Sequence, residues 1–316
     1  MIIEDVSGYS FRPADLKISE RKPGISAFMR TRNGADFLEA TIRSHVRFYD
    51  EIVVVFNQCT DSTEEILSRL TRELGPRLRV FHYRDRVQPL GSPQHAATPG
   101  HHPESMVNYS NFALAQTRHQ IAVKLDDDHL AIPEPVEKIA RALRAGQKDL
   151  SLLYCFSGLN IARNTCGGLA IPAADPISGG GDIGYFRVSS DTFFYHDRRF
   201  ERFGHSSLKR RFSGFLYWHL KFLKAGAGFG NYELGNNPGS RFVHKKERFE
   251  HSAFWTLPGA IRNLKPGVLD QVASQFSSKA RLRTDRNKAI RTAFPDISLE
   301  AALDRTAPGW RGLLKL

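Results

Sequence analysis

The chain has 316 residues, of which 41% are hydrophobic and 11% aromatic, so it can bury a substantial core and is not a disordered protein. No stretch approaches the ~20 apolar residues that span a bilayer, and the N-terminus lacks the basic and apolar regions of a signal peptide. The three cysteines, Cys59, Cys155 and Cys166, are too few and too scattered for a disulfide framework or a metal clip. We therefore expect a cytoplasmic protein.

The formal net charge of +12 gives the chain a sequence pI near 9.8. Such a charge attracts phosphates, nucleic acid or an anionic membrane face. A basic surface that serves only solubility explains the charge equally well. The charge alone therefore does not choose among these partners.

Short apolar runs alternate with amphipathic stretches between residues 25 and 145, a pattern typical of β-α units that build a mostly parallel sheet. We expect strands at residues 25–29, 51–56, 78–83 and 121–125. Helices are expected after the first two strands and again at residues 106–116, because apolar residues recur there at helical spacing. The predicted fold class is α/β, with a central sheet flanked by helices.

Three carboxylates, Asp126, Asp127 and Asp128, come directly after the fourth of these strands. Adjacent ionised carboxylates repel one another, so a divalent cation is the natural partner that offsets their charge. Ligands of open α/β sheets gather outside the carboxyl ends of the strands, which is where this run is expected. Mg²⁺ and Mn²⁺ take oxygen ligands of this kind. The alternative is a solvated acidic turn in which an aspartate caps the following segment.

Four stretches of the first half follow one another in the order and spacing of a known enzyme family. They read ISAFMRTRNGADFLEATI, VVVFNQCTDSTEEIL, VNYSNFALAQT and VKLDDDHLAIPEPVEKI, and together they cover roughly residues 24–145. In this order they resemble glycosyltransferase family 2 and its relatives, which have the GT-A fold. The resemblance implies a Rossmann-like sheet, a nucleotide-sugar donor and a divalent metal, Mn²⁺ or Mg²⁺, as cofactor.

The resemblance also assigns roles to individual residues. Asp126 and Asp128 match the two acidic positions of the family's DxD motif, which binds the metal and the diphosphate of the donor. Asp127 lies between them and is counted with Asp126 among the donor-binding residues. Thr31 and Asn57 fall where the family contacts the base and the ribose. The usual pair of acids after the second strand is missing, so the nucleotide is not identified, and Asn57 is equally a strand-end turn residue.

In the acceptor half, the family often has a helix that begins with Glu-Asp, whose carboxylate deprotonates the acceptor hydroxyl. Apolar residues at helical spacing predict that helix at residues 212–223, but a Ser-Gly pair stands where the acids belong. His219 is interpreted as a packed residue of this helix. The nearby acids that remain as candidates for the base are Asp182, Asp191 and Glu201.

A histidine further along the chain frequently completes the metal site of GT-A enzymes. The resemblance points to His244, at the end of a predicted strand, with His251 as its rival and a solvent-exposed histidine as the alternative. Imidazole suits Mn²⁺ better than Mg²⁺. Arg241, Lys245 and Lys246 flank His244 and offer positive charge to the departing diphosphate.

One long connection stands out between the third strand and the helix at residues 106–116. Residues 84–105 have no periodicity, and a connection of this length inside a compact domain is usually functional or disordered. Its prolines and histidines lead us to expect a mobile lid that becomes ordered over the donor or the acceptor.

The domain prediction divides the chain into three parts. Residues 1–145 form the nucleotide-sugar-binding half of a GT-A domain, residues 146–260 its acceptor-binding half, and residues 261–316 a basic C-terminal helical appendage. The end of the chain, from Trp310 to Leu316, mixes aromatic, leucine and cationic residues as an interfacial anchor does. A helix packed on the domain is the alternative. The anchor interpretation predicts a peripheral protein at the inner face of the cytoplasmic membrane.

The functional prediction is metal-dependent transfer of a sugar from a nucleotide-sugar to a saccharide or lipid-linked glycan acceptor, in the synthesis of a cell-surface polysaccharide such as lipopolysaccharide. A nucleotidyltransferase acting on sugar phosphates is the first alternative. It is disfavoured because residues 30–34, after the first strand, contain a single glycine instead of a glycine-rich phosphate loop. A non-catalytic nucleic-acid-binding protein would explain the charge but not the three carboxylates, and no nucleic-acid partner is expected.

Overall fold

The computed structural model describes residues 3–180, 184–197, 200–204, 208–294 and 296–314. The strands of the main sheet are β1 (Glu4–Val6), β2 (Lys22–Thr31), β3 (Glu51–Asn57), β4 (Leu78–Tyr83), β5 (His119–Lys124), β6 (His129–Ala131), β7 (Leu152–Asn160), β10 (Ile177–Ser178), β11 (Gly184–Arg187) and β14 (Lys209–His219). Two smaller sheets contain β12 (Phe194–Asp197) with β13 (Phe200–Phe203), and β8 (Ala162–Arg163) with β9 (Leu169–Pro172) and β15 (Phe254–Trp255).

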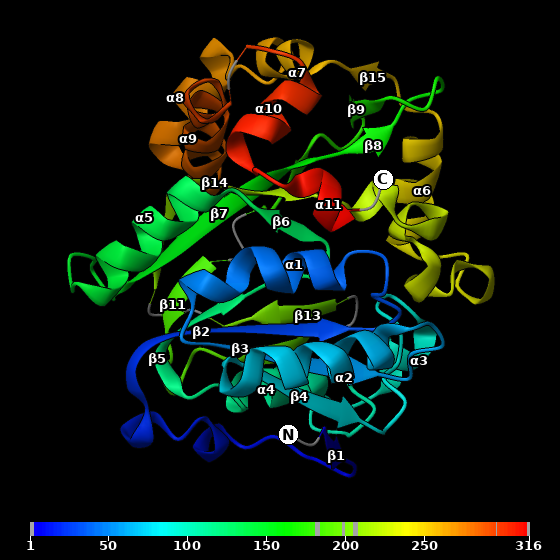
Figure 1. Cartoon of the computed structure of the whole chain (residues 1–316), viewed down its shortest axis with the longest axis vertical. Helices are drawn as coiled ribbons and strands as arrows, with labels where there is room; N and C mark the ends of the chain where they lie inside the picture. Colours follow the sequence, from blue (N-terminus) through cyan, green and yellow to red (C-terminus); the bar gives the residue numbers. More distant parts are fainter. Residues whose placement is uncertain (1–2, 181–183, 198–199, 205–207, 295, 315–316) are drawn as a thin grey trace.

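The helices flank this sheet and continue to the end of the chain (Figure 1). They are α1 (Leu38–His45), α2 (Thr63–Leu74), α3 (Pro93–Ala97), α4 (Met106–Ala115), α5 (Pro133–Arg144), α6 (Arg241–Glu250), α7 (Leu257–Asn263), α8 (Val268–Phe276), α9 (Ser278–Ala293), α10 (Leu299–Thr306) and α11 (Trp310–Leu314). The strands and helices predicted for the first half are confirmed. No helix within the described residues is long and apolar enough to cross a membrane.

The main sheet has the order β1-β4-β3-β2-β5-β11-β7-β14-β6, with β10 beside β7. All neighbours from β1 to β5 are parallel, as are β7 and β14, whereas β6, β10 and β11 run antiparallel to their neighbours. The predicted mostly parallel α/β sheet with helices on its faces and a helical C-terminal part is therefore confirmed. The chain places β3 on one side of β2 and β5 on the other, so a topological switch point lies here.

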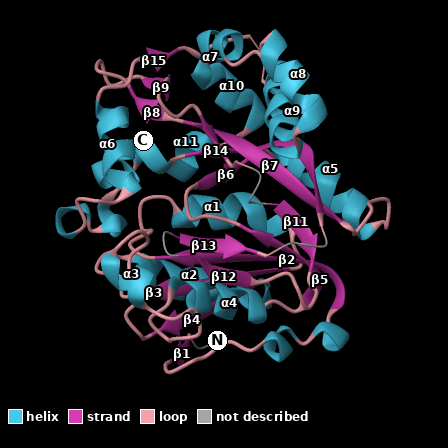
Figure 2. Ribbon diagram, turned by 180° about the vertical axis from the view of Figure 1, so that it is seen from behind, coloured by secondary structure: helices cyan, strands magenta, loops and turns pink. Residues whose placement is uncertain are grey.

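Helices cover both faces of this sheet (Figures 1 and 2). On one face, α1, α2 and α5 pack on a buried cluster that includes Ala27 and Met29 of β2. On the other face, α4 packs on a cluster that includes Phe28, the residue between them. Neighbouring side chains of a strand point to opposite faces, and every residue of β3 is buried, as expected for a strand with both faces covered.

The helix predicted at residues 212–223 is wrong, because most of this segment forms the strand β14. Phe215 and Trp218 belong to one buried cluster, whereas Leu216 and Tyr217 belong to another on the opposite face. An apolar run that is buried on both faces has no period that separates strand from helix. Its aromatic residues and the long pairing with β7 favour the strand.

The end of the chain packs into a third cluster. Trp310 is 4% exposed and Leu314 is 5% exposed, and both contact the core formed by α7, α9 and α10 with β14. The packed-helix alternative is therefore confirmed for Trp310–Leu314, whereas residues 315 and 316 of the predicted anchor lie outside the described residues. One continuous sheet runs through both predicted halves of the domain, and the boundaries at residues 145 and 260 stay a prediction.

The connection at residues 84–105 is more ordered than predicted. It contains the short helix α3, whose first turn is capped by Ser92, and it buries Val87 and His95. Its role as a mobile lid stays a prediction.

Candidate active site

The three aspartates follow β5 at the switch point of the sheet. β5 is held between β2 and β11, so the chain leaves the sheet at its carboxyl edge with Asp126, Asp127 and Asp128. The side chain of Asp126 is 39% exposed, whereas those of Asp127 and Asp128 are 11% and 8% exposed. Two buried carboxylates and one accessible carboxylate thus meet where α/β sheets bind ligands.

Asp127 is held from the end of β2. The hydroxyl of Thr31 donates a hydrogen bond to its Oδ2. A Cβ atom at Gly34 would lie 2.6 Å from the same oxygen, so only glycine fits beside this pair. Thr31 therefore positions a carboxylate of the site, and its predicted contact with the nucleotide stays a prediction.

Asp126 is balanced by its own strand. Lys124 Nζ lies 2.5 Å from its Oδ1, and His129 Nε2 lies 3.8 Å from its Oδ2. Burial alone would raise the pKa of Asp126, but Lys124 and His129 hold it below its usual range. This carboxylate is therefore ionised at neutral pH.

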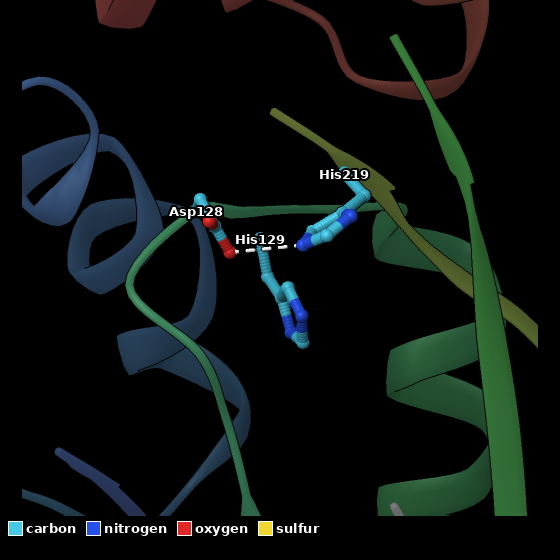
Figure 3. A group of neighbouring side chains, drawn as sticks. All are labelled: Asp128, His129 and His219. Carbon is cyan, nitrogen blue, oxygen red and sulfur yellow. Dashed lines mark ion pairs between the residues drawn. The ribbon is translucent and has the colours of Figure 1, made fainter. Parts of the chain in front are cut away.

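Asp128 faces two histidines, one of them brought from the far half of the chain. β14 pairs with β6 so that His219 stands opposite His129, and Leu220 donates a backbone hydrogen bond of 2.8 Å to the carbonyl of Asp128. His219 Nε2 lies 3.1 Å from Asp128 Oδ1, and Figure 3 shows the two side chains pointing toward each other. Asn160 holds the other ring nitrogen of His219.

The residues of this group fit a divalent metal ion. The ligand atoms of Asp128, His129 and His219 lie within 4.8 Å of one another, and all three side chains are buried. Neither ring nitrogen of His129 has a hydrogen-bond partner among the described residues. Burial lowers the pKa of His129 to about 3, so its ring is neutral and free to ligate. A carboxylate with imidazoles is a donor set that suits Mn²⁺.

A lysine from the opposite wall also reaches the carboxylates. Lys224 Nζ lies 2.5 Å from Asp127 Oδ1 and 2.9 Å from Asp128 Oδ2. Burial opposes its charge, but the two carboxylates raise the pKa of Lys224 above its ordinary value. The same lysine, together with His219, holds the pKa of Asp128 well below its usual range against the effect of burial.

Lys224 belongs to a wall of short 3₁₀ turns that follows β14. The turns are η5 (Lys221–Leu223), η6 (Ala225–Gly228), η7 (Gly230–Tyr232) and η8 (Leu234–Asn236). Lys221 Nζ lies 4.5 Å from the ring centre of Phe229 and 5.5 Å from that of Tyr232. Burial and the neighbouring Lys245 lower the pKa of Lys221 to about 8. Two lysines of this wall thus stand close to the aspartates.

The predicted base residues are placed differently from one another. Glu201 on β13 forms a 2.7 Å ion pair with Arg30 of β2, and both side chains are about nine-tenths buried. Burial opposes the charge of Arg30, but Glu201 and Asp126 raise its pKa, so the pair stands beside the aspartates. Asp191 accepts a 2.5 Å hydrogen bond from Ser189. Asp182 lies outside the described residues.

The side chain of Asn57, at the end of β3, forms hydrogen bonds with backbone groups of neighbouring residues. Its amide nitrogen donates to the carbonyls of Tyr83 and Asp85 at 2.6 and 2.7 Å, and its oxygen accepts from the backbone of Val87 at 3.3 Å. These bonds tie the end of β3 to the start of the 84–105 connection. The predicted contact of Asn57 with the nucleotide stays a prediction.

His244 lies elsewhere than predicted. The strand expected to end there is wrong, because Ser240 caps the helix α6 and only Phe242 of that helix is buried. The side chain of His244 is 78% exposed and pairs with Glu247 at 3.2 Å, and His251 at the end of α6 is exposed as well. Neither joins the group formed by Asp128, and a metal role for His244 stays a prediction.

The flanking cations are also on α6. Lys245 and Lys246 make ion pairs with Asp175 and Glu250 at 3.8 and 3.6 Å, and the guanidinium of Arg241 lies over the Phe242 ring. Of these, Lys245 is close enough to Lys221 to affect its pKa. The wall after β14 thus supplies the lysine nearest to the aspartates.

Sequence reasoning missed His219, His129 and Lys224 as members of the site. The adjacency of His129 to the aspartates was a usable local signal. For His219 and Lys224 the usable signal was β14 itself, because a strand that ends beside β6 delivers its last residue to Asp128. Interpreting residues 212–223 as a helix concealed that pairing.

Comparison with known proteins finds no family model and no curated protein that matches the chain. Among solved structures it is similar to glucosyl-3-phosphoglycerate synthase from Mycobacterium tuberculosis in complex with Mg²⁺ and UDP, with 19% identity, a TM-score of 0.29, and coverage of 50% of this chain and 51% of that chain. The chain thus spans about half the length of that match. The same enzyme with Mn²⁺, UDP-glucose and phosphoglyceric acid matches at 15% identity and a TM-score of 0.37, over 81% of this chain and 95% of that chain. Similarity this low does not establish a shared function.

Proposed function

We propose that the protein is a metal-dependent glycosyltransferase that moves a sugar from a nucleotide-sugar to a saccharide or lipid-linked glycan acceptor. The observation that carries the proposal is the meeting of Asp128 and His129 with His219, beside Asp126, at the switch point of a Rossmann-like sheet. A diphosphate needs a cation at this point, and carboxylate with imidazole provides the ligands for one.

The donor set proposed for Mn²⁺ or Mg²⁺ is Asp128, His129 and His219, with Asp126 beside it. When bound, the ion supplies positive charge that stabilises the leaving diphosphate. Asp127, fixed by Thr31, keeps Lys224 at the edge of this set. Lys224 lies between the 3₁₀ turns η5 and η6, outside the sheet, and is proposed to exchange its two carboxylates for phosphate oxygens of the donor.

The lysines of the loop wall are proposed to bind the diphosphate. Lys221 and Lys224 lie three residues apart after β14, and the side chain of Lys224 is 13% exposed. Buried cations act on a charged leaving group far more strongly than cations in water do. The two lysines therefore replace Lys245 and Lys246 as the nearest positive charges.

Glu201 is the base that the geometry favours. Arg30 ties it to the end of β2, close enough to Asp126 for that carboxylate to raise the pKa of Arg30. Its carboxylate is proposed to accept the proton of the acceptor hydroxyl. Asp191 accepts a 2.5 Å hydrogen bond from Ser189, within its own turn.

The two alternative functions are less well supported by this site. A nucleotidyltransferase would bind its triphosphate on a glycine-rich loop after the first strand, where this chain has Thr31 and Gly34 around Asp127. A nucleic-acid-binding protein has no need of buried carboxylates with imidazole. The acceptor, a role in cell-surface polysaccharide synthesis and a place at the membrane's inner face belong to the proposal.

The test is a panel of UDP-, GDP-, CMP- and dTDP-sugars, including UDP-glucose, measured for thermal stabilisation with and without Mn²⁺. A ligand at about 100 times its dissociation constant adds about 2.7 kcal/mol to the stability of the folded protein. We expect one nucleotide class to stabilise the wild type only with metal, and to lose this effect in Asp128→Asn. No metal-dependent stabilisation by any member of the panel would overturn the proposal.

A further inference from the structure

The helix α8 exposes its apolar residues to solvent, whereas an ordinary surface helix buries them. It runs from Val268 to Phe276 and contains no buried residue. Four of its side chains are among the seven large hydrophobic residues that are exposed in the described part of the chain. They are Val268 (77% exposed), Leu269 (85%), Val272 (50%) and Phe276 (84%).

These four residues lie on one side of the helix. Their spacing of one, four and eight residues from Val268 places them along a single stripe, which Ala273 extends. Asp270 and Ser274 lie on the other side. α8 is therefore amphipathic, and its apolar side is the one that faces solvent.

Polar contacts hold α8 in this orientation against α9. Asp270 forms an ion pair with Arg283, and its carbonyl accepts a 3.1 Å hydrogen bond from Thr284. Arg281 donates a 3.3 Å hydrogen bond to the carbonyl of Ser274. The polar side of α8 therefore contacts α9. Both views show α8 and α9 side by side at the periphery of the molecule (Figures 1 and 2).

Single exposed apolar residues are normal, but a contiguous apolar stripe marks a surface that binds a membrane or another protein. The charges around α8 distinguish between these two partners. Four exposed cationic residues precede and follow α8 in the sequence: Arg262, Lys265, Lys279 and Arg281, here called the rim. The single acid in residues 262–281 is Asp270, which is paired with Arg283. A second copy docked on α8 would bring two such cationic rims together. An anionic lipid surface complements both the apolar stripe and its rim.

We propose that α8 is a membrane-contact helix that lies in the interface of an anionic bilayer, with Leu269 and Phe276 in the acyl region and the rim lysines at the headgroups. The binding is cumulative, reversible and sensitive to salt, because a nine-residue helix buries little apolar surface. The inference places the contact on α8, in place of the buried end of the chain. It does not depend on the transfer reaction and is tested without it.

The test is co-sedimentation of the full chain with vesicles of phosphatidylcholine alone or mixed with phosphatidylglycerol. We expect wild type to bind the anionic vesicles at low salt, with at least tenfold weaker binding to neutral vesicles or at high salt. The double variant Leu269→Ser/Phe276→Ser should lose binding about tenfold or more. The matched control is Ile18→Ser/Ile297→Ser, which removes two exposed apolar side chains that do not belong to α8 and should bind as wild type does.

Two further measurements separate the membrane from other occupants. Lys265→Glu/Lys279→Glu should weaken binding to anionic vesicles while leaving the melting temperature unchanged. Phe276→Trp should give fluorescence that brominated lipids quench beyond the wild-type level. Wild type that stays in the supernatant at low salt would overturn the proposal. A wild-type dimer that Leu269→Ser/Phe276→Ser converts to monomer, without vesicle binding, would show that a second copy covers α8 instead.

Discussion

The two walls of the candidate site are built in different ways. The acidic wall consists of strand ends, with Asp127 and Asp128 set by the register of β5 between its neighbours and by Thr31. The basic wall consists of 3₁₀ turns after β14, in which Lys224 is placed by backbone bonds to residues only three apart. The sheet thus fixes the acids, whereas local turns position the cations. Substitutions in the two walls should therefore have different consequences.

The largest effect is expected on the acidic wall. Asp126→Asn and Asp128→Asn should each lower metal-dependent turnover by about 10²–10³-fold or more, because a metal ion contributes several kcal/mol to the stabilisation of the transition state. Steady-state kinetics with the donor found in the panel would measure this. Both variants should stay folded, although Asp128→Asn should melt at a lower temperature because its carboxylate pairs with Lys224 and His219. Full activity of both variants would contradict the metal site.

A similar loss is expected for the proposed base. Glu201→Gln should reduce kcat by about 10²–10⁴-fold while Mn²⁺ binding persists, because a general base acts on the acceptor and not on the metal. Asp191→Asn is the matched control and should retain activity. If Asp191→Asn loses activity instead and Glu201→Gln keeps it, the base assignment is exchanged.

Glu51 is expected to stabilise the sheet that carries the acidic wall without taking part in the reaction. Glu51 begins β3 at the opposite edge of the sheet, and its side chain is 4% exposed. It accepts 2.7 Å hydrogen bonds from Ser26 and the backbone of Arg118, with Arg79 at 3.3 Å. Burial alone would raise the pKa of Glu51, but His119, Ser26 and Arg118 lower it to about 2.

A carboxylate whose pKa is lowered on folding stabilises the protein above its unfolded pKa and loses this contribution as pH falls through the folded value. Glu51→Gln should therefore cost about 3 kcal/mol near pH 7, because folding lowers the pKa of this carboxyl from 4.5 to about 2, and should leave donor binding intact. The difference from wild type should shrink between about pH 4.5 and 2 in urea unfolding. The exposed Glu137→Gln is the control, and a pH-independent difference would contradict the assignment.

The contrast between the walls also explains what the sequence could predict. The acidic wall comes from strands with strong local signals, such as the fully buried Glu51–Asn57, followed by three aspartates. The basic wall depends on β14, whose pairing with β7 and β6 spans long distances along the chain. Apolar spacing cannot report such pairing, so residues 212–223 were interpreted as a helix and His219 as a packed residue. The orientation of α8 depends on Asp270 and Arg283 and was likewise not visible.

The next prediction compares the histidine expected from the sequence with the one found in the structure. His219→Ala should weaken Mn²⁺ binding about 10–100-fold, the range typical of substitutions around a metal site. His244→Ala should have no effect, because that side chain is 78% exposed and pairs with Glu247. Isothermal titration with Mn²⁺ measures both. Weaker binding in His244→Ala with unchanged binding in His219→Ala would restore the original assignment.

The smallest expected effect has the opposite sign and comes from the basic wall. Lys224 lies within 2.9 Å of Asp127 and Asp128, so a metal ion that approaches these carboxylates meets a positive charge already in place. Lys224→Met should therefore raise the affinity for Mn²⁺ alone by a few-fold, about 3–10, because like charges a few ångströms apart repel even in a screened site. Affinity for the nucleotide diphosphate should fall in the same variant, since the variant lacks the positive charge proposed to contact the leaving diphosphate. Lys221→Met is the comparison variant, because that lysine lies over aromatic rings and acts on Asp128 only at longer range, so it should raise the affinity for Mn²⁺ less than Lys224→Met does. Electron paramagnetic resonance of free Mn²⁺ during titration measures both variants. Weaker Mn²⁺ binding in Lys224→Met would mean that the lysine supports the acidic wall and does not compete with the metal.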